Sequence, residues 1–292
     1  MISRNFGGSG FRVSALGFGA GHIGSNEISD NDAGRLLNFA LDKGINLVDT
    51  ARGYGLSEER IGKYLSHRRS EFIISTKVGY DIPGFQDWTH NIIIAGIDAA
   101  LKRLNTDIID IVHLHTCSLQ ILQQGEVIDA LDKAKADGKI KVAAYSGENE
   151  ALRYALHSGR FGSIQTSLNV TDQRDLNDLI PKAKEQRMGV IAKRPVANAL
   201  WKYRERPDGS YAEEYWLRWN KMNLQFDIEP QELFIRFSTF APGVDSAIIG
   251  TSNINHLKTA IDAVNKGPLP EDINKKIRIS FAENDDNWIG KV

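Results

Sequence analysis

The alternation of short β-type runs with helical patterns constrains this chain more than any other feature. Eight apolar runs cover residues 12–19, 45–51, 72–79, 108–116, 140–147, 163–169, 189–195 and 245–252. Helical patterns follow them at residues 30–44, 57–65, 91–104, 125–136, 150–156, 178–186, 230–240 and 254–264. Eight successive βα units predict an α/β fold in which the strands close into a (β/α)8 TIM barrel.

The organisation of the chain indicates one domain. Its 292 residues suit one barrel, and no linker or shift in composition divides them, so we expect residues 1–292 to form a single barrel domain. Residues 1–13 predict a short β-hairpin that turns at the sequence GGSG and closes the bottom of the barrel. The longest connection, residues 197–227, follows the seventh run, and connections of this length are usually functional.

The composition disfavours several classes of partner. The net charge is −1 and the pI is about 6.7, so we expect neither nucleic acid nor a membrane surface as a main partner. The single cysteine, Cys117, excludes an intramolecular disulfide and a metal site built on clustered cysteines, which suits a reducing compartment. We expect a cytoplasmic protein without a bound metal, either a monomer or a weak homo-oligomer, that acts on a small molecule.

Residues 19–24 read GAGHIG and match the Gly-x-Gly-x-x-Gly pattern of Rossmann domains. In a Rossmann domain the helix opens within the motif, so that its N-terminus meets the pyrophosphate. Here the residues SNEIS separate Gly24 from the expected helix cap at Asp30. The motif therefore predicts a loop that passes close over the barrel mouth.

Four polar residues lie at the ends of neighbouring predicted strands. Asp49 lies near the end of the second run, Lys77 near the end of the third and His115 near the end of the fourth, and Tyr54 follows in the loop after the second run. Side chains alternate along a strand, so these residues are expected to converge at the carboxyl end of the barrel, where barrel enzymes carry their active sites. His113 shares the strand face of His115 but lies one layer deeper, so we expect it to be a core histidine.

The combination of these side chains suits proton transfer to a carbonyl oxygen. A phenol titrates near pH ~10 and rarely exchanges protons at neutral pH, but a nearby ammonium stabilises the phenolate. Asp49 would hold Lys77, and His115 would orient the carbonyl or share in the proton transfer. We therefore assign Tyr54 as general acid/base, with the hydride supplied by a cofactor.

Other interpretations of the same residues stay open. A lone Asp–Lys pair inside a barrel can be structural, and a loop tyrosine often only packs. An aldolase that forms a Schiff base on Lys77 is disfavoured, because Asp49 keeps the lysine charged. A non-catalytic nucleotide-binding redox sensor or regulatory subunit would keep the whole set of residues.

Several segments resemble the aldo-keto reductase family, and the resemblance covers nearly all of the chain. They are residues 44–65 (GINLVDTARGYGLSEERIGKYL), STKVG at 75–79, TDIIDIVHLH at 106–115, APGVDSAIIGTSNINHL at 241–257 and NWIGKV at 287–292. The resemblance implies NAD(P)H-dependent reduction of an aldehyde or ketone, or the reverse oxidation. It aligns the family's tyrosine, lysine, aspartate and histidine with Tyr54, Lys77, Asp49 and His115.

The resemblance also implies cofactor contacts. Gly19 and Ala20 would lie near the nicotinamide, Ser146 and Gln165 would hold its carboxamide, and Asp49 is a further cofactor contact. Further contacts are Lys193 and Arg194 at the end of the seventh run, with Pro195 and Val196 bordering the pyrophosphate. At the end of the eighth run they are Gly250 and, near the adenosine, Thr251, Ser252 and Asn253.

Three positions depart from the family pattern. Gly147 replaces an asparagine, Lys193 replaces a tyrosine that stacks on the nicotinamide, and Ser252 replaces an arginine that binds the 2′-phosphate. His256 and Lys258 are the nearest cations to that last position. NADPH is our first choice of cofactor because the family mostly prefers it, and NADH is the alternative.

Aromatic residues near the predicted mouth are candidates for the substrate pocket. They are Trp88 and Trp201, together with His22. The aromatic segment 201–219 would form a pocket wall or a lid, with plain packing on the barrel as the competing interpretation.

Overall fold

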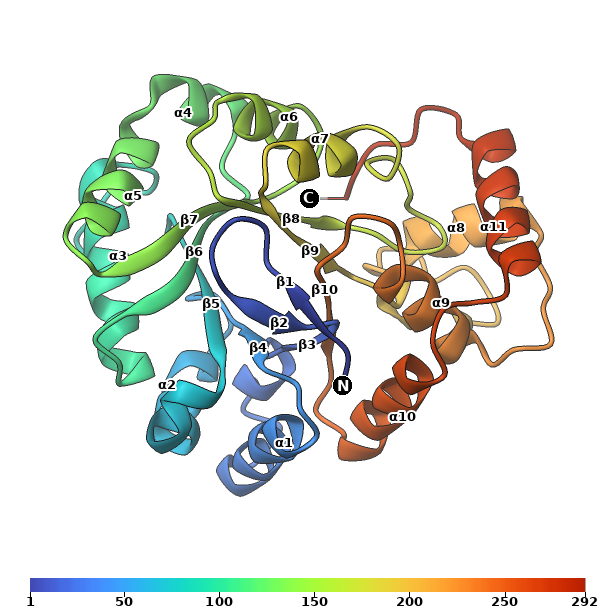
Figure 1. The fold of residues 1–292 in the computed structure, drawn as a ribbon, viewed down its shortest axis with the longest axis horizontal. Helices are drawn as coiled ribbons and strands as arrows, with labels where there is room; N and C mark the ends of the chain where they lie inside the picture. Colours follow the sequence, from blue (N-terminus) through green and yellow to red (C-terminus); the bar gives the residue numbers. More distant parts are fainter. Residues whose placement is uncertain (292) are drawn as a thin grey trace.

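The computed structural model describes residues 1–291, and the last residue of the NWIGKV segment, Val292, lies outside them. Eight parallel strands close into a barrel in the order β10-β3-β4-β5-β6-β7-β8-β9, with helices around it (Figure 1). The strands are β3 (Leu16–Gly19), β4 (Leu47–Asp49), β5 (Ile73–Val78), β6 (Ile109–His115), β7 (Ile140–Ser146), β8 (Ser163–Ser167), β9 (Gly189–Lys193) and β10 (Ser246–Gly250). The predicted (β/α)8 TIM barrel is confirmed.

Eleven α-helices are present within residues 1–291. They are α1 (Asp30–Asp42), α2 (Ser57–Leu65), α3 (His90–Leu104), α4 (Leu119–Gln124), α5 (Glu126–Ala136), α6 (Asn149–His157), α7 (Leu179–Glu185), α8 (Glu213–Met222), α9 (Pro230–Thr239), α10 (Ile254–Asn265) and α11 (Glu271–Asn284). The eight helical patterns did not include α4, which is short, α8, which lies in the long connection, or α11. Helix α11 buries only Ile277 and Phe281, so its hydrophobic periodicity is weak.

The expected first strand, residues 12–19, is in fact two strands. Strand β2 (Arg12–Ser14) pairs antiparallel with β1 (Ser3–Asn5), and the barrel starts only at β3. The hairpin seals the barrel as expected, because Phe6 is fully buried against side chains of the barrel interior such as Leu47, Ile111 and Ile191. A second correction concerns the N-cap of α1, which is Ser29 and not Asp30. The Ser29 side chain accepts a hydrogen bond from the amide of Asp32.

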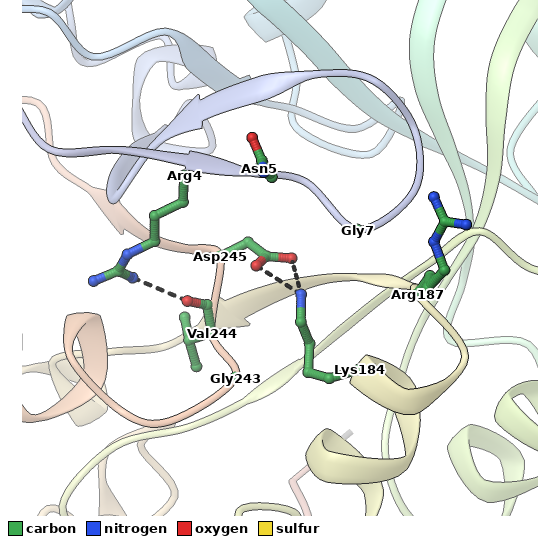
Figure 2. Close-up of a pocket in the computed structure, with 8 residues that line it drawn as sticks. All are labelled: Arg4, Asn5, Gly7, Lys184, Arg187, Gly243, Val244 and Asp245. Carbon is green, nitrogen blue, oxygen red and sulfur yellow. Dashed lines mark hydrogen bonds and ion pairs between the residues drawn. The ribbon is translucent and has the colours of Figure 1, made fainter.

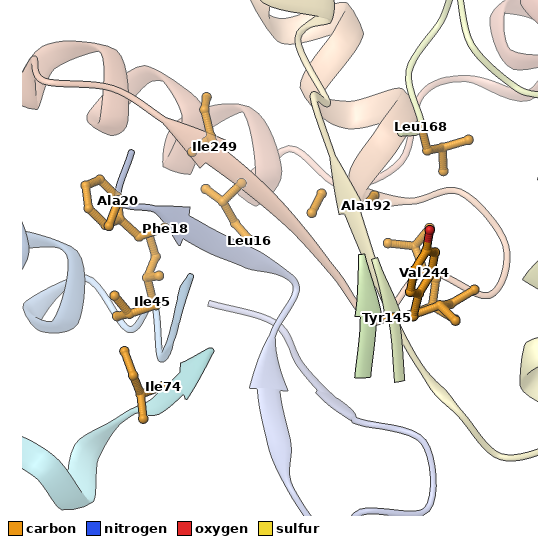
Figure 3. Packing of buried hydrophobic residues seen from close by; sticks show 14 of the residues in the cluster. Leu16, Phe18, Ala20, Ile45, Ile74, Tyr145, Leu168, Ala192, Val244 and Ile249 are labelled. Carbon is orange, nitrogen blue, oxygen red and sulfur yellow. The ribbon is translucent and has the colours of Figure 1, made fainter. Parts of the chain in front are cut away.

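The core consists of two layers of apolar side chains. The larger layer lies between the strands and the surrounding helices, and Figure 3 shows part of it around Leu16, Phe18 and Ile249. The smaller layer fills the barrel interior at the hairpin end. Parallel strands that are covered on both sides are expected to be apolar, so the polar residues that interrupt β4 to β8 stand out.

No helix within residues 1–291 has both the length and the apolar content to cross a bilayer.

The strand register brings these polar residues to one end of the barrel. Asp49 pairs with Gly19 on one side and with Ser75 on the other. Further round the barrel, the paired residues are Lys77 with His113, His115 with Ser146, and Ser146 with Gln165. Parallel pairing therefore places residues far apart in sequence at the same mouth.

Candidate active site

A buried ion pair lies at the carboxyl end of the barrel. The Lys77 Nζ is 2.6 Å from Oδ2 of Asp49, and both side chains are 2 % exposed. Nζ also donates to the carbonyl oxygen of Thr50 at 2.8 Å. Burial alone would lower the pKa of Lys77, but Asp49 and Tyr54 together raise it, so the ammonium form is favoured. The site therefore holds a fixed positive charge.

The Asp49 carboxylate is held by three donors. Besides Lys77, Ser75 Oγ donates to Oδ1 at 2.8 Å and Gln165 Nε2 donates to the same oxygen at 3.0 Å. Ser146 Oγ in turn donates to Oε1 of Gln165 at 2.8 Å. Strands β4, β5, β7 and β8 are thus linked by polar side chains across the barrel, which fixes the orientation of Asp49.

Tyr54 lies in the turn after β4 and faces this pair. The Lys77 Nζ is 5.0 Å from the centre of the Tyr54 ring. Tyr54 is close enough to act with Asp49 in raising the pKa of Lys77. The carboxylate, the ammonium and the phenol therefore form one contiguous group.

His115 completes this group at the end of β6. Its ring packs edge-on against Tyr54, with 5.9 Å between the ring centres. On its other side Tyr80 stacks on the imidazole, and the Tyr80 hydroxyl is 2.7 Å from Nδ1. Burial, together with Lys77 and Lys193, lowers the pKa of His115 to about 2, so the imidazole is neutral.

His113 lies one layer deeper, as predicted for a core histidine. It is fully buried, and its Nε2 lies 3.1 Å from the Ser75 hydroxyl. Burial lowers its pKa to about 3. The ring is closed off from solvent and contacts the group around Asp49 through Ser75.

The GAGHIG segment is a close-packed loop and not a Rossmann turn. Its last residues form a 3-10 turn, His22–Gly24, and α1 begins only at Asp30. A Cβ on Gly24 would lie 1.6 Å from the carbonyl oxygen of Tyr54, whereas a Cβ on Gly21 would make ordinary contact with the Tyr54 ring at 3.6 Å. The third glycine therefore lets the loop rest on the Tyr54 turn.

Lys193, which stands where the family pattern has a tyrosine, forms an ion pair with a buried carboxylate. Lys193 Nζ is 3.1 Å from Oε1 of Glu148, which also accepts hydrogen bonds from Ser167 and Arg174. Burial lowers the pKa of Lys193, and Glu148 opposes that effect. Lys193 also lowers the pKa of His115, so its charge acts on the mouth of the barrel.

The side chain of the neighbouring Arg194 makes hydrogen bonds within the protein. Its guanidinium donates to the carbonyl oxygen of Lys291 at 2.5 Å and to Ser167 Oγ at 3.3 Å. Its carbonyl oxygen accepts from Asn169 at 3.0 Å, while Pro195 and Val196 follow it at the start of the long connection. That connection contains the 3-10 helix η3 (Ala197–Lys202) and helix α8.

The loop after β10 opens onto a cavity of about 1020 Å³. Ser252 and Asn253 line it together with Gly21 and His22. Thr251 is buried beside them and accepts a hydrogen bond from the Asn253 amide at 3.0 Å, and Gly250 lies against Gly19. The cavity is large enough for part of a dinucleotide, and the N-terminus of α10 beside it suits an anionic group.

The two tryptophans assigned to the pocket have different surroundings. Trp88 packs against Tyr80, with 5.9 Å between the ring centres, and so connects to His115. Trp201 packs on Phe234 of α9, as does Trp219. Tyr215 is fully buried, so packing accounts for much of the aromatic segment.

A second cavity, of about 500 Å³, lies at the opposite end of the barrel (Figure 2). Arg4 and Gly7 of the hairpin, Lys184, Arg187 and Asp245 line it, and Lys184 is paired with Asp245. These residues lie where strands β9 and β10 begin, so the cavity is remote from Tyr54.

Three residues of the site were not predicted from the sequence. Ser75 holds Asp49, Tyr80 contacts His115, and Glu148 binds Lys193. Ser75 shares a strand face with Lys77, which is the one signal that the pattern offered. Tyr80 and Glu148 lie beyond strand ends, where periodicity says nothing about direction.

A closed parallel barrel with ionisable side chains gathered at the carboxyl ends of its strands is the architecture of barrel enzymes. The model of the aldo/keto reductase family matches residues 15–280. The chain is 30 % identical to L-galactose dehydrogenase of Arabidopsis thaliana, covering 89 % of this chain and 87 % of that protein. It is 28 % identical to D-threo-aldose 1-dehydrogenase of a Pseudomonas species, covering 84 % and 87 % of the two chains.

Among solved structures, an aldo-keto reductase from Bacillus halodurans in its holo form superposes with a TM-score of 0.83. The two sequences are 29 % identical, and the match covers 96 % of each chain. The chain belongs to the aldo/keto reductase family. It is accordingly an oxidoreductase of carbonyl or alcohol groups in a family that uses nicotinamide cofactors.

Proposed function

We propose that this protein transfers a hydride between NADPH and a small aldehyde, ketone or alcohol, with Tyr54 as general acid/base. The observation that carries the proposal is the buried Lys77–Asp49 pair beneath the Tyr54 ring. A fixed ammonium beside a phenol stabilises the phenolate that remains after proton transfer. No nucleophile or metal ion is required for this chemistry.

The residues have separate roles in the reduction. The cofactor supplies the hydride to the carbonyl carbon. Tyr54 gives its phenolic proton to the carbonyl oxygen, and the resulting phenolate is stabilised by Lys77, which Asp49 holds in place. His115 is neutral and binds the carbonyl oxygen through an N–H group. Oxidation of an alcohol uses the same groups in reverse, with Tyr54 as the base.

The residues at the mouth fit a nicotinamide cofactor by their chemistry. Ser146 bonds to Gln165 and Gln165 to Asp49, and the hydroxyl and carboxamide that they carry are groups that can also pair with a nicotinamide carboxamide. Gly19 and Gly250 lie against each other at the same mouth, so the backbones of β3 and β10 approach closely there. Ser252, Asn253 and the N-terminus of α10 suit the adenosine ribose and its phosphate.

Two features bear on the choice between NADPH and NADH. Ser252 is uncharged and exposed, so the 2′-phosphate would rely on Lys258, His256 and the helix N-terminus. Glu27 and Asp32 line the same cavity as Ser252, and Arg35 pairs with Asp32. We propose NADPH first, with NADH as the competing cofactor.

The decisive experiment is a titration with both cofactors, followed by measurement of turnover. Tryptophan fluorescence would be followed while NADPH and then NADH is added, and the tighter cofactor would be used on a panel of small aldehydes and aldoses. Aldoses belong in the panel because two relatives are sugar dehydrogenases. Binding with turnover is the expected result. Binding without turnover on any substrate would favour a regulatory nucleotide-binding protein, and no binding would refute the proposal.

A further inference from the structure

His115 carries a single ring proton, and its position decides what the ring can do. The imidazole is neutral because burial and two nearby lysines keep its pKa far below neutral pH. In a neutral imidazole one nitrogen is a donor and the other is an acceptor. A ring that presents its unprotonated nitrogen to a carbonyl oxygen would repel that oxygen, whereas an N–H would bind it.

Tyr80 occupies one of the two nitrogens. Its hydroxyl lies 2.7 Å from Nδ1 of His115. The two rings stack at 5.5 Å with an angle of 27° between their planes, so the contact has fixed geometry. The Trp88 ring also packs against the Tyr80 ring, with 5.9 Å between the ring centres, and this contact limits the movement of Tyr80.

The direction of this hydrogen bond follows from acid–base strength. A phenol is a stronger acid than a neutral imidazole N–H, and an imidazole nitrogen is a better acceptor than a phenol oxygen. Burial raises the pKa of Tyr80, so the phenol keeps its proton. Within residues 1–291 neither the Tyr80 hydroxyl nor Nε2 of His115 has another hydrogen-bond partner. The arrangement in which Tyr80 donates to Nδ1 is therefore favoured.

We propose that Tyr80 is a positioning residue that fixes His115 in the tautomer with its proton on Nε2. The hydrogen bond made by one ring nitrogen sets the protonation of the other. Nε2–H is then available to the substrate oxygen beside the Tyr54 hydroxyl, whose ring lies edge-on to the imidazole at 5.9 Å. This inference rests on the proposed function, because it gives the Nε2 proton a substrate oxygen to bind.

Nitrogen NMR of protein labelled with ¹⁵N-histidine measures the tautomer directly. The His115 signal would be assigned as the one that His115→Asn removes. We expect wild-type His115 to show a protonated Nε2 and an unprotonated Nδ1. In Tyr80→Phe we expect signals shifted towards a mixture of both tautomers, because the phenyl ring keeps the stacking and removes the donor.

Turnover gives a second readout. Tyr80→Phe should lower kcat by roughly fivefold to tenfold, the share that one neutral hydrogen bond supplies. Cofactor affinity should stay within about twofold, because Tyr80 is not among the proposed cofactor contacts. Tyr64→Phe is the matched control, since Tyr64 is also half-buried but packs against Gly34 on α1. It should change neither the His115 signals nor kcat.

Two results would overturn the role of Tyr80. One is a wild-type His115 protonated on Nδ1. The other is a Tyr80→Phe protein whose His115 signals match those of the wild type. Failure of the proposed function looks different: the Nε2–H tautomer would be present and dependent on Tyr80, but no carbonyl or alcohol would turn over.

Discussion

The Lys77 ammonium lies 2.6 Å from the Asp49 carboxylate, and each side chain is 2 % exposed. Removing one partner of such a pair leaves an uncompensated buried charge, which typically costs about 3–5 kcal/mol. Lys77→Met and Asp49→Asn should each lower the free energy of unfolding by about 3 kcal/mol. The double variant should lose less than the sum by at least about 1 kcal/mol, because it removes both charges. Urea unfolding measures all four proteins, and strictly additive losses would contradict the coupling.

Replacing Tyr54 by phenylalanine removes the proposed proton donor and keeps the ring that packs on His115. General acid–base catalysis typically contributes about 10²–10⁴-fold, so kcat should fall at least about a hundredfold. The dissociation constant for NADPH should stay within about threefold, as fluorescence titration would show. Tyr64→Phe is the control for loss of a hydroxyl elsewhere. Wild-type turnover in Tyr54→Phe would refute the assignment of Tyr54 as acid.

The stability of the protein should depend on pH through His113, which is fully buried. Its pKa is about 3 in the folded state and near 6.5 in the unfolded chain. As the pH falls below 6.5, the unfolded chain binds a proton that the folded protein does not, so stability is lost towards pH 3. Through His113 the free energy of unfolding should fall by about 1.4 kcal/mol for each pH unit in this range.

The test of this dependence compares slopes and not absolute stabilities. His113→Asn should show a shallower fall in the free energy of unfolding between pH 6.5 and pH 4 than the wild type. His67→Asn, at an exposed histidine, should leave the slope unchanged. An equal slope in wild type and His113→Asn would show that His113 does not titrate between the two states.

The last two glycines of the GAGHIG loop, Gly21 and Gly24, should respond differently to replacement by alanine. At Gly24 the new methyl group would meet the backbone of Tyr54, which cannot move freely, so Gly24→Ala should destabilise the protein by about 2 kcal/mol or more. Gly21→Ala places its methyl group at ordinary distance from the Tyr54 ring and should cost less than about 1 kcal/mol. Thermal unfolding measures both, and equal effects would contradict the close approach at Gly24.

The sequence by itself determined the barrel and the positions of Asp49, Lys77 and His115 on it. Alternation along a strand fixes which side chains share a face, and parallel closure brings the strand ends together. Residues 12–19 show the limit of this reasoning, because the apolar run continues through the break at Ala15 between the hairpin and the barrel.

Only the tertiary structure decided which partners these residues meet. The Tyr80 hydroxyl reaches His115 from beyond a strand end, Glu148 reaches Lys193 past the intervening strand β8, and Gly24 meets Tyr54 where two loops touch. Residues beyond strand ends follow no period, so their directions depend on how the loops pack. Periodicity is a property of local backbone geometry, whereas these contacts arise from the closure of the whole barrel.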